Sequence, residues 1–260
     1  MVKFASLPFQ MSEKMKKVLG IIPARYASTR FPGKPLADIQ GKPMIQWVYE
    51  RCSPAFDYLV VATDDYRIIN AVNGFGGEAV LTAENHESGT DRCLEAYHIL
   101  QKQNGQDFDI IVNVQGDEPL VKSEQLFELT SCFENDGVRI ATLIHPLEDP
   151  EQVNNPDIVK VVVDKGYKAL YFSRSAIPFK RKSGTNITYF KHIGLYAYTS
   201  EVLKKICALE PSGMELAEGL EQLRWLENGY AIHTKITHHE NVGVDSPADL
   251  EKVRSMLRDR

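Results

Sequence analysis

Apolar runs and segments of helical length alternate along the first half of the chain. The apolar runs lie at 18–23, 58–63 and 109–114, with a weaker one at 78–81. A run that stays apolar at consecutive positions is typical of a strand that is covered on both faces. The helical segments lie at 43–53, 65–73 and 90–103, the last of which opens with Thr90 and Asp91. Strands that alternate with helices predict βαβ units and therefore a parallel sheet.

The spacing of the elements changes after Pro119. A helix near 123–134 is followed by strand candidates at 138–144, 158–164 and 168–173, which are too close together for a helix between each pair. This spacing predicts an α+β segment that departs from the βαβ pattern of the first half. A polar stretch at 180–188 then precedes a strand at 192–198. The chain closes with helices at 200–208 and 215–227, a strand at 230–236 and a last helix at 247–258.

These patterns together predict an α/β fold with a Rossmann-like, mostly parallel sheet flanked by helices. An inserted α+β lobe is expected in the second half, at about 138–200, within a single domain over 16–260. A chain of 260 residues is long enough for this arrangement. Residues 1–15 are expected to form a flexible N-terminal extension.

Charge and cysteine content narrow the classes of partner. Thirty Lys and Arg against 35 Asp and Glu give a net charge of −5, which disfavours duplex nucleic acid and anionic membranes. The four cysteines form neither a CxxC pair nor a zinc spacing, so we expect reduced thiols in a cytoplasmic protein. No apolar run approaches the ~18 residues that suggest a membrane span. Any anion that the protein binds must therefore be held by local cations.

A cationic loop follows the first predicted strand. It carries Arg25, Arg30 and Lys34 among small residues and Gly33. Ligands of open parallel sheets bind beyond the carboxyl ends of the strands, so this loop stands where a ligand is expected. Its cations suit a triphosphate, although the loop is neither a Walker loop nor a GxGxxG fingerprint. The alternative is a solvated surface loop with incidental arginines.

Two aspartates are candidates for a magnesium site. Asp117 follows the apolar run at 109–114, at the same predicted edge of the sheet as the cationic loop, where a cation that bridges phosphates needs oxygen ligands. Its neighbour Glu118 is assigned to a turn, and the alternative is a supporting group behind the metal ligands. Asp245 precedes the last predicted helix, and the alternative there is that Asp245 or Ser246 caps that helix.

Seven blocks of the sequence, taken in order, resemble the 3-deoxy-manno-octulosonate cytidylyltransferases of the nucleotidyltransferase superfamily. They lie at 21–36, 87–92, 113–119, 171–174, 192–196, 221–224 and 243–245. The likeness extends from about residue 17 to residue 257. It implies an enzyme that transfers CMP from CTP to the anomeric hydroxyl of 3-deoxy-D-manno-octulosonate (Kdo), giving CMP-Kdo and pyrophosphate for lipopolysaccharide synthesis.

The resemblance also implies roles for individual residues. The family's catalytic positions correspond to Arg30, Lys34 and Asp117. The positions that contact the nucleotide correspond to Ala24, Arg25, Ser88 and Gly89. The two carboxylates that bind Mg²⁺ correspond to Asp117 and Asp245. The positions that line the sugar site correspond to Gln115, Arg174, His192, Glu221 and Gln222.

Several alternatives stay open at this point. The substrate could be another acidic sugar such as sialate, or the chain could be a nucleotide-binding regulator without catalytic activity. For His192, a place in the core is the alternative to a sugar contact. The resemblance further implies a homodimer that uses the inserted lobe.

Overall fold

The chain is described from a computed structural model that covers residues 16–27, 31–182 and 184–258. Seven strands of its main sheet follow the order β11-β7-β10-β6-β1-β4-β5. One half of this sheet is formed by β1 (Val18–Ala24), β4 (Tyr58–Thr63), β5 (Ala79–Leu81) and β6 (Ile110–Asn113). All neighbouring strands in this half are parallel. The expectation of a parallel sheet built from these four apolar runs is therefore confirmed.

The other half of the main sheet contains an antiparallel strand. It is formed by β7 (Ile140–Leu147), β10 (Tyr189–Thr199) and β11 (Ile232–Ile236). Strand β10 runs antiparallel to both β6 and β7, whereas β11 is parallel to β7. The sheet is thus mostly parallel, as expected.

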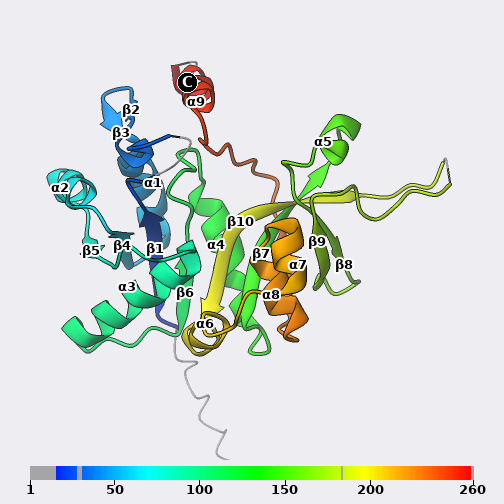
Figure 1. Cartoon of the computed structure of the whole chain (residues 1–260), viewed down its shortest axis with the longest axis horizontal. Coiled ribbons are helices and arrows are strands. Elements are labelled where there is room, and N and C mark those ends of the chain that lie inside the picture. The colour runs from blue at the N-terminus through cyan, green and yellow to red at the C-terminus, as the bar shows by residue number, and fades with distance from the viewer. Residues whose placement is uncertain (1–15, 28–30, 183, 259–260) are drawn as a thin grey trace, which may run out of the picture.

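Helices cover both faces of the sheet (Figure 1). One face packs against α3 (Gly89–Asn104), α6 (Ser200–Ile206) and α8 (Gln222–Glu227). The other packs against α1 (Met44–Cys52), α2 (Tyr66–Gly74) and α4 (Ser123–Ser131). Alternate residues of a strand point to opposite faces, so Ile21 lies in the first core cluster and Ile22 in the second. Both are fully buried, which is why this strand is apolar at consecutive positions.

The inserted part is smaller than the sequence suggests. A hairpin of β8 (Lys160–Val163) and β9 (Ala169–Ser173) joins the main sheet where β8 pairs with β10, and α5 (Pro150–Asn154) precedes it. In Figure 1 these elements lie at the opposite end of the sheet from α2 and β5. Strands β7 and β10, which lie within the predicted lobe, belong to the main sheet. The segment that leaves the main sheet is therefore confined to the residues between β7 and β10.

The helix predicted at 215–227 is wrong as a single element. The structure divides it into α7 (Gly213–Glu218) and α8, because Gly219 ends α7 in the left-handed region with φ of 63°. The hairpin of β2 (Asp38–Ile39) and β3 (Lys42–Pro43) was not predicted. Short 3₁₀ turns lie at Lys34–Leu36, Ser53–Ala55 and Cys132–Glu134.

The last helix, α9 (Pro247–Arg258), has the predicted bounds and packs on a third, smaller core cluster. No helix in the described ranges is long and apolar enough to cross a membrane. The extension predicted at 1–15 lies outside the described residues.

Candidate active site

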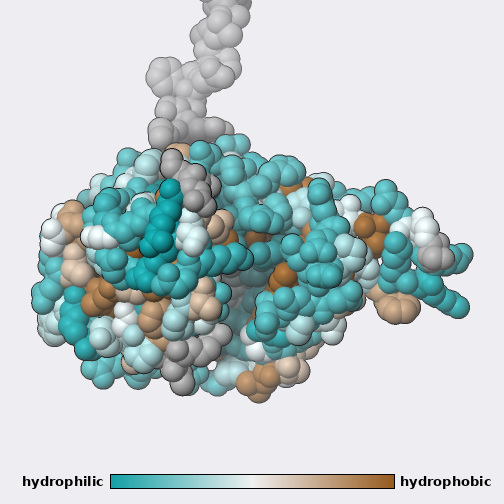
Figure 2. Space-filling view, turned by 90° about the horizontal axis from the view of Figure 1, so that it is seen from above, coloured by the Kyte–Doolittle hydropathy of each residue, from teal (hydrophilic) through white to brown (hydrophobic). Residues whose placement is uncertain are grey.

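A pocket of about 260 Å³ opens at the carboxyl ends of β1 and β6. It is lined by Pro23, Ala24, Arg25, Lys34, Pro35, His86, Glu87, Ser88, Gly89, Arg92, Gln115, Gly116, Asp117 and Asp245. Figure 2 shows this side of the molecule hollowed between two lobes, with mostly hydrophilic residues around the hollow. The pocket therefore lies at the edge of the sheet where the sequence predicts a ligand.

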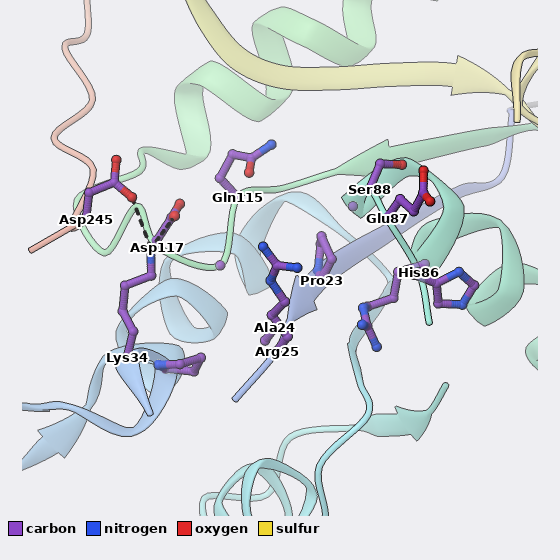
Figure 3. A pocket seen from close by; sticks show the side chains of 14 residues that line it. Pro23, Ala24, Arg25, Lys34, His86, Glu87, Ser88, Gln115, Asp117 and Asp245 are labelled. Carbon is purple, nitrogen blue, oxygen red and sulfur yellow. Dashed lines mark hydrogen bonds and ion pairs between the residues drawn. The ribbon is translucent and has the colours of Figure 1, made fainter. Parts of the chain in front are cut away.

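Lys34 lies between the two predicted metal-binding carboxylates (Figure 3). Its Nζ atom is 2.7 Å from Oδ2 of Asp117 and 3.4 Å from Oδ1 of Asp245. The turn before it explains this position, because Gly33 adopts a φ of 72° and its N–H donates to the carbonyl of Tyr26 at 2.9 Å. Three of the predicted site residues, Lys34, Asp117 and Asp245, are thus brought together in one pocket.

Asp117 is held close to β1 by the glycine before it. A Cβ atom on Gly116 would lie 2.7 Å from the carbonyl oxygen of Pro23, so only glycine allows this approach. The carbonyl of Asp117 accepts a hydrogen bond of 2.9 Å from the N–H of Val244. That bond brings the segment before α9 next to the β6 loop. Burial and the neighbouring Asp117 carboxylate raise the pKa of Glu118 to about 8.

The start of α9 separates the roles of Asp245 and Ser246. The N–H of Asp249 donates to the Ser246 hydroxyl at 3.3 Å, and the N–H of Ser246 donates to the Asp249 carboxylate at 2.9 Å. This reciprocal pair is a capping box, so Ser246 provides the cap. The carboxylate of Asp245 faces Lys34 instead.

The N-terminus of α3 forms another wall of the pocket. The helix begins at Gly89 and not at Thr90, because the Ser88 hydroxyl accepts from the N–H of Asp91 at 3.1 Å and caps it. A Cβ atom on Gly89 would lie 3.3 Å from the ring of Pro23, so the glycine allows α3 to approach β1 closely. The positive end of the helix dipole therefore borders the pocket near the cations of the first loop.

Three lining residues with titratable side chains, His86, Glu87 and Arg92, received no role from the sequence. Arg92 is 3% exposed, and its guanidinium donates to Asp64 at 2.9 Å and to Thr82 at 2.6 Å. His86 contacts the Glu95 carboxylate through Nε2, and Glu87 lies beside it on the pocket wall. Glu87 and Arg92 belong to a sequence block that resembles the family, and this resemblance could have identified them as candidate site residues. Arg30 lies outside the described residues.

Comparison with known proteins identifies the family. A family model described as cytidylyltransferase matches residues 19–236. The chain is 52% identical to 3-deoxy-manno-octulosonate cytidylyltransferase of Parabacteroides distasonis, with 95% of this chain and 100% of that protein covered. The chain belongs to the 3-deoxy-manno-octulosonate cytidylyltransferase family. It is accordingly a nucleotidyltransferase, and the resemblance found in the sequence is confirmed.

Other members and solved structures agree with this assignment. The cytidylyltransferase of the same description from Syntrophus aciditrophicus is 49% identical, with 95% of this chain and 99% of that protein covered. A solved structure of CMP:2-keto-3-deoxy-manno-octonic acid synthetase complexed with CTP has a TM-score of 0.87 and 44% identity, covering 94% and 99% of the two chains. A cytidylyltransferase from Leptospira borgpetersenii, 17% identical, covers 94% and 88% with a TM-score of 0.61, which shows the fold alone.

Two of the residues predicted for the sugar site of this cytidylyltransferase differ in their access to the pocket. Gln115 lines the pocket, and its Nε2 donates to the carbonyl of Gly194 at 2.9 Å. Arg174 is not among the lining residues. Its guanidinium donates to the carbonyls of Glu218 at 2.8 Å and Pro156 at 3.2 Å.

His192 lies on β10, in an aromatic environment. Its ring packs edge-on against Phe172, and its Nε2 lies 3.1 Å from the Thr142 hydroxyl. Burial, with a smaller effect of the Lys191 charge, lowers the pKa of His192 to about 3. The imidazole is therefore neutral near pH 7, and it can form hydrogen bonds but supplies no charge to a ligand.

Glu221 and Gln222 lie at the start of α8, where Glu221 contacts the first turn of α3. The Thr90 hydroxyl donates to the Glu221 carboxylate at 2.7 Å, and burial raises the pKa of Glu221. Gln222 is 5% exposed, and its Nε2 has no hydrogen-bond partner among the described residues. A buried donor without a partner costs free energy, so this atom is a place where a bound polar ligand would be favourable.

The carboxylates in the pocket suit a magnesium ion that also binds phosphates. Within the described ranges, no group of three or more His, Cys, Asp or Glu side chains is arranged to hold a metal ion. The pocket instead offers the carboxylates of Asp117 and Asp245. Mg²⁺ is commonly bound by one or two carboxylates together with substrate phosphates and water. The donor set therefore fits a cation whose remaining ligands are water or phosphate oxygens.

Proposed function

We propose that the protein transfers the CMP group from CTP to the anomeric hydroxyl of Kdo, with release of pyrophosphate. The names of its relatives support these substrates. The observation that carries the proposal is the contact of one ammonium, Lys34, with both Asp117 and Asp245, in a pocket bordered by the N-terminus of α3. Cations, carboxylates and a helix N-terminus together are what a magnesium-bound triphosphate requires.

The cationic side chains would act on the leaving group. Lys34 and Arg25, with Arg30 from the same loop, would meet the negative charge that grows on pyrophosphate as the bond to the α-phosphorus breaks. The sugar hydroxyl would attack that phosphorus from the opposite side. Phosphoryl transfer needs positioning and charge neutralisation more than covalent help, so no enzyme-bound intermediate is required.

Asp117 and Asp245 are the residues that would hold Mg²⁺. When bound, this cation neutralises phosphate charge and lowers the pKa of the attacking hydroxyl. Lys34 lies close enough to both carboxylates to offset their mutual repulsion before substrate binds. The same ammonium would then be available to the phosphates.

The sugar is proposed to bind beside Gln115, toward β10 and α8. Gln115 contributes an amide on the pocket wall, and Gln222 contributes the buried Nε2 without a partner. The neutral His192 would accept or donate a hydrogen bond to a sugar hydroxyl. Arg174 would reach the sugar only by exchanging its contacts with two main-chain carbonyls.

The direct test is pyrophosphate release by the purified full-length protein with CTP, Kdo and Mg²⁺. A parallel reaction with sialate in place of Kdo tests the choice of acidic sugar. Release that requires Kdo and Mg²⁺ supports the proposal, whereas release with sialate alone reassigns the substrate. Binding of CTP without any turnover would instead identify a nucleotide-binding regulator.

We further propose that the enzyme is a cytoplasmic homodimer that uses the inserted part of the fold. Two apolar side chains there are solvent-exposed in the single chain, Leu170 at 58% and Phe179 at 86%. Large apolar side chains that are this exposed gain free energy when a protein contact removes them from water. Sedimentation velocity should then give about twice the chain mass of 29.3 kDa, and a monomer at micromolar concentration would contradict the dimer.

A further inference from the structure

The segment that carries Asp245 contains neither helix nor strand. It comprises residues 237–246, between β11 and α9, and we call it the strap. In Figure 1 it runs as an orange coil from the end of the sheet near β7 up to α9. Because a coil has no internal ladder of hydrogen bonds, the position of Asp245 depends on what anchors the strap to the rest of the molecule.

Hydrogen bonds along its length anchor the strap. They include Thr237 N–H to the Ile144 carbonyl at 2.9 Å, His145 Nδ1 with the Thr237 carbonyl at 3.0 Å, Gln125 Nε2 to the His239 carbonyl at 3.2 Å, Asn241 Nδ2 to the Glu118 carboxylate, and Val244 N–H to the Asp117 carbonyl at 2.9 Å. The last two reach the loop that carries Asp117. Two neighbouring residues of that loop, Asp117 and Glu118, therefore hold the part of the strap nearest to Asp245.

The Asn241 contact is enclosed within the protein. Asn241 is 8% exposed, and its Oδ1 has no hydrogen-bond partner among the described residues, so the side chain is held through the hydrogen bond that its Nδ2 donates to Glu118. Val244, three residues later, is fully buried against Leu120 and Leu250. Only two residues separate Asn241 from Val244, whose N–H donates to the Asp117 carbonyl at 2.9 Å. A shift of Asn241 on loss of its anchor would strain that bond and change the position of Asp245 relative to Asp117.

We infer that the hydrogen bond between Glu118 and Asn241 is a positioning contact that sets the distance between the carboxylates of Asp117 and Asp245. Neither side chain needs to touch the substrates. The pair would act through the two aspartates, so its loss should weaken the binding of a divalent cation. This inference rests on the proposed function, because it takes those two aspartates as the metal ligands.

The first test is the binding of Mn²⁺ to the full-length protein without substrates, followed by the electron paramagnetic resonance signal of free Mn²⁺. Outer contacts of metal ligands typically contribute about 10–100-fold to metal affinity. We expect Asn241→Ala and Glu118→Ala each to weaken Mn²⁺ binding by at least about tenfold. The double variant should be no weaker than either single one, since both remove the same contact.

The variant Glu118→Gln tests whether the Glu118 side chain acts through its hydrogen bond to Asn241 or through its charge. The glutamine carbonyl can still accept from Asn241, so binding within about threefold of wild type supports a positioning role. A loss as large as that of Glu118→Ala would show that the charge matters and would overturn the inference. In pyrophosphate release, the Mg²⁺ concentration for half-maximal rate should rise in the alanine variants, while kcat at saturating Mg²⁺ stays near wild type.

Gln125→Ala is the matched control. Gln125 is a fully buried amide that anchors the strap at its other end, through the His239 carbonyl. Its loss should lower Tm about as much as Asn241→Ala but change Mn²⁺ binding less than about twofold. Equal losses of Mn²⁺ binding in both variants would indicate general destabilisation and overturn the inference.

The outcomes also distinguish this inference from the proposed function. Wild-type protein that neither binds Mn²⁺ nor requires Mg²⁺ would remove the metal site and with it both proposals. Wild-type binding that Asn241→Ala and Glu118→Ala leave unchanged would overturn the positioning role alone. If Asn241→Ala does not fold, Asn241→Leu keeps the volume, removes the donor and gives the same comparison.

Discussion

In the proposed nucleotide half of the site, the predicted residues that the structure describes line one pocket, whereas in the proposed sugar half most of them contact protein groups instead. Arg25, Lys34 and Asp117 all border the pocket at the ends of β1 and β6. Arg174, by contrast, donates to main-chain carbonyls, and Glu221 accepts from Thr90. The proposed cradle for phosphates is thus formed within one chain. The sugar half must exchange existing hydrogen bonds or use groups such as Gln222 that have none.

This difference predicts unequal contributions to catalysis. A contact between charged groups and phosphate is stronger than a neutral hydrogen bond, and it is strengthened further in a site that excludes water. Exchange of one neutral hydrogen bond for another contributes only about 0.5–1.5 kcal/mol. Substitutions in the nucleotide half should therefore have the larger effects.

The largest effect is expected for Lys34→Met. The variant keeps much of the side chain's length but removes the ammonium that contacts both aspartates. Loss of one preorganised group that stabilises transition-state charge costs about 100–1,000-fold. We expect kcat/KM for CTP to fall by about this factor in steady-state pyrophosphate release.

Lys42→Met is the control for this prediction. Lys42 is a 42% exposed lysine that pairs with Glu50, outside the pocket. Its removal should change kcat/KM less than about twofold, since an exposed ion pair contributes little. Turnover within about threefold of wild type in Lys34→Met would place the phosphates elsewhere.

Asp117→Asn should have the next largest effect. The substitution keeps the shape of the side chain and removes the charge that would bind Mg²⁺. We expect kcat to fall by at least about tenfold, or roughly 1.4 kcal/mol of transition-state stabilisation. Asp136→Asn, at an exposed carboxylate paired with Lys16, is the control. Wild-type turnover in Asp117→Asn would show that Asp117 is not a metal ligand.

Gln222→Leu tests the sugar half through opposite effects on stability and binding. Removal of a buried donor without a partner should stabilise the fold, because such a donor costs about 1–3 kcal/mol. If that donor binds the sugar, KM for Kdo should rise about fivefold while KM for CTP is unchanged. Thermal unfolding and steady-state kinetics measure the two effects on the same preparation. A higher Tm with an unchanged KM for Kdo would remove Gln222 from the sugar site.

The two halves also differ in how far the sequence predicts them. The loops after β1 and β6 meet because parallel strands deliver their carboxyl ends to one edge of the sheet, and apolar runs are enough to identify those strands. This is why Lys34 and Asp117 could be expected to lie close together. Asp245 joins them through Val244, whose hydrogen bond to the Asp117 carbonyl has no signature in the pattern.

In the sugar half, the element boundaries and side-chain positions depend on tertiary contacts that the local sequence pattern does not predict. The break between α7 and α8 depends on the left-handed conformation of Gly219, in a segment whose pattern is otherwise helical. Strands β7 and β10 look like parts of an insertion by spacing, yet they complete the main sheet by pairing across long sequence separations. The direction of the Arg174 guanidinium depends on carbonyls of Glu218 and Pro156, which no motif specifies.

The smallest effect is expected from the pH dependence of stability at His192. Its pKa is lowered from 6.5 to about 3 by burial and, to a smaller degree, by Lys191. Between these values the unfolded chain binds a proton that the folded chain does not, so stability falls as pH decreases below 6.5. The slope can reach about 1.4 kcal/mol per pH unit and should be discounted for partial exposure. Urea unfolding of His192→Gln should show a shallower decline than wild type, while His238→Gln, at an exposed histidine, should not. Parallel curves for wild type and His192→Gln would mean that the imidazole already accepts a proton in the folded state, and the sugar half would then carry a charge available to a carboxylate.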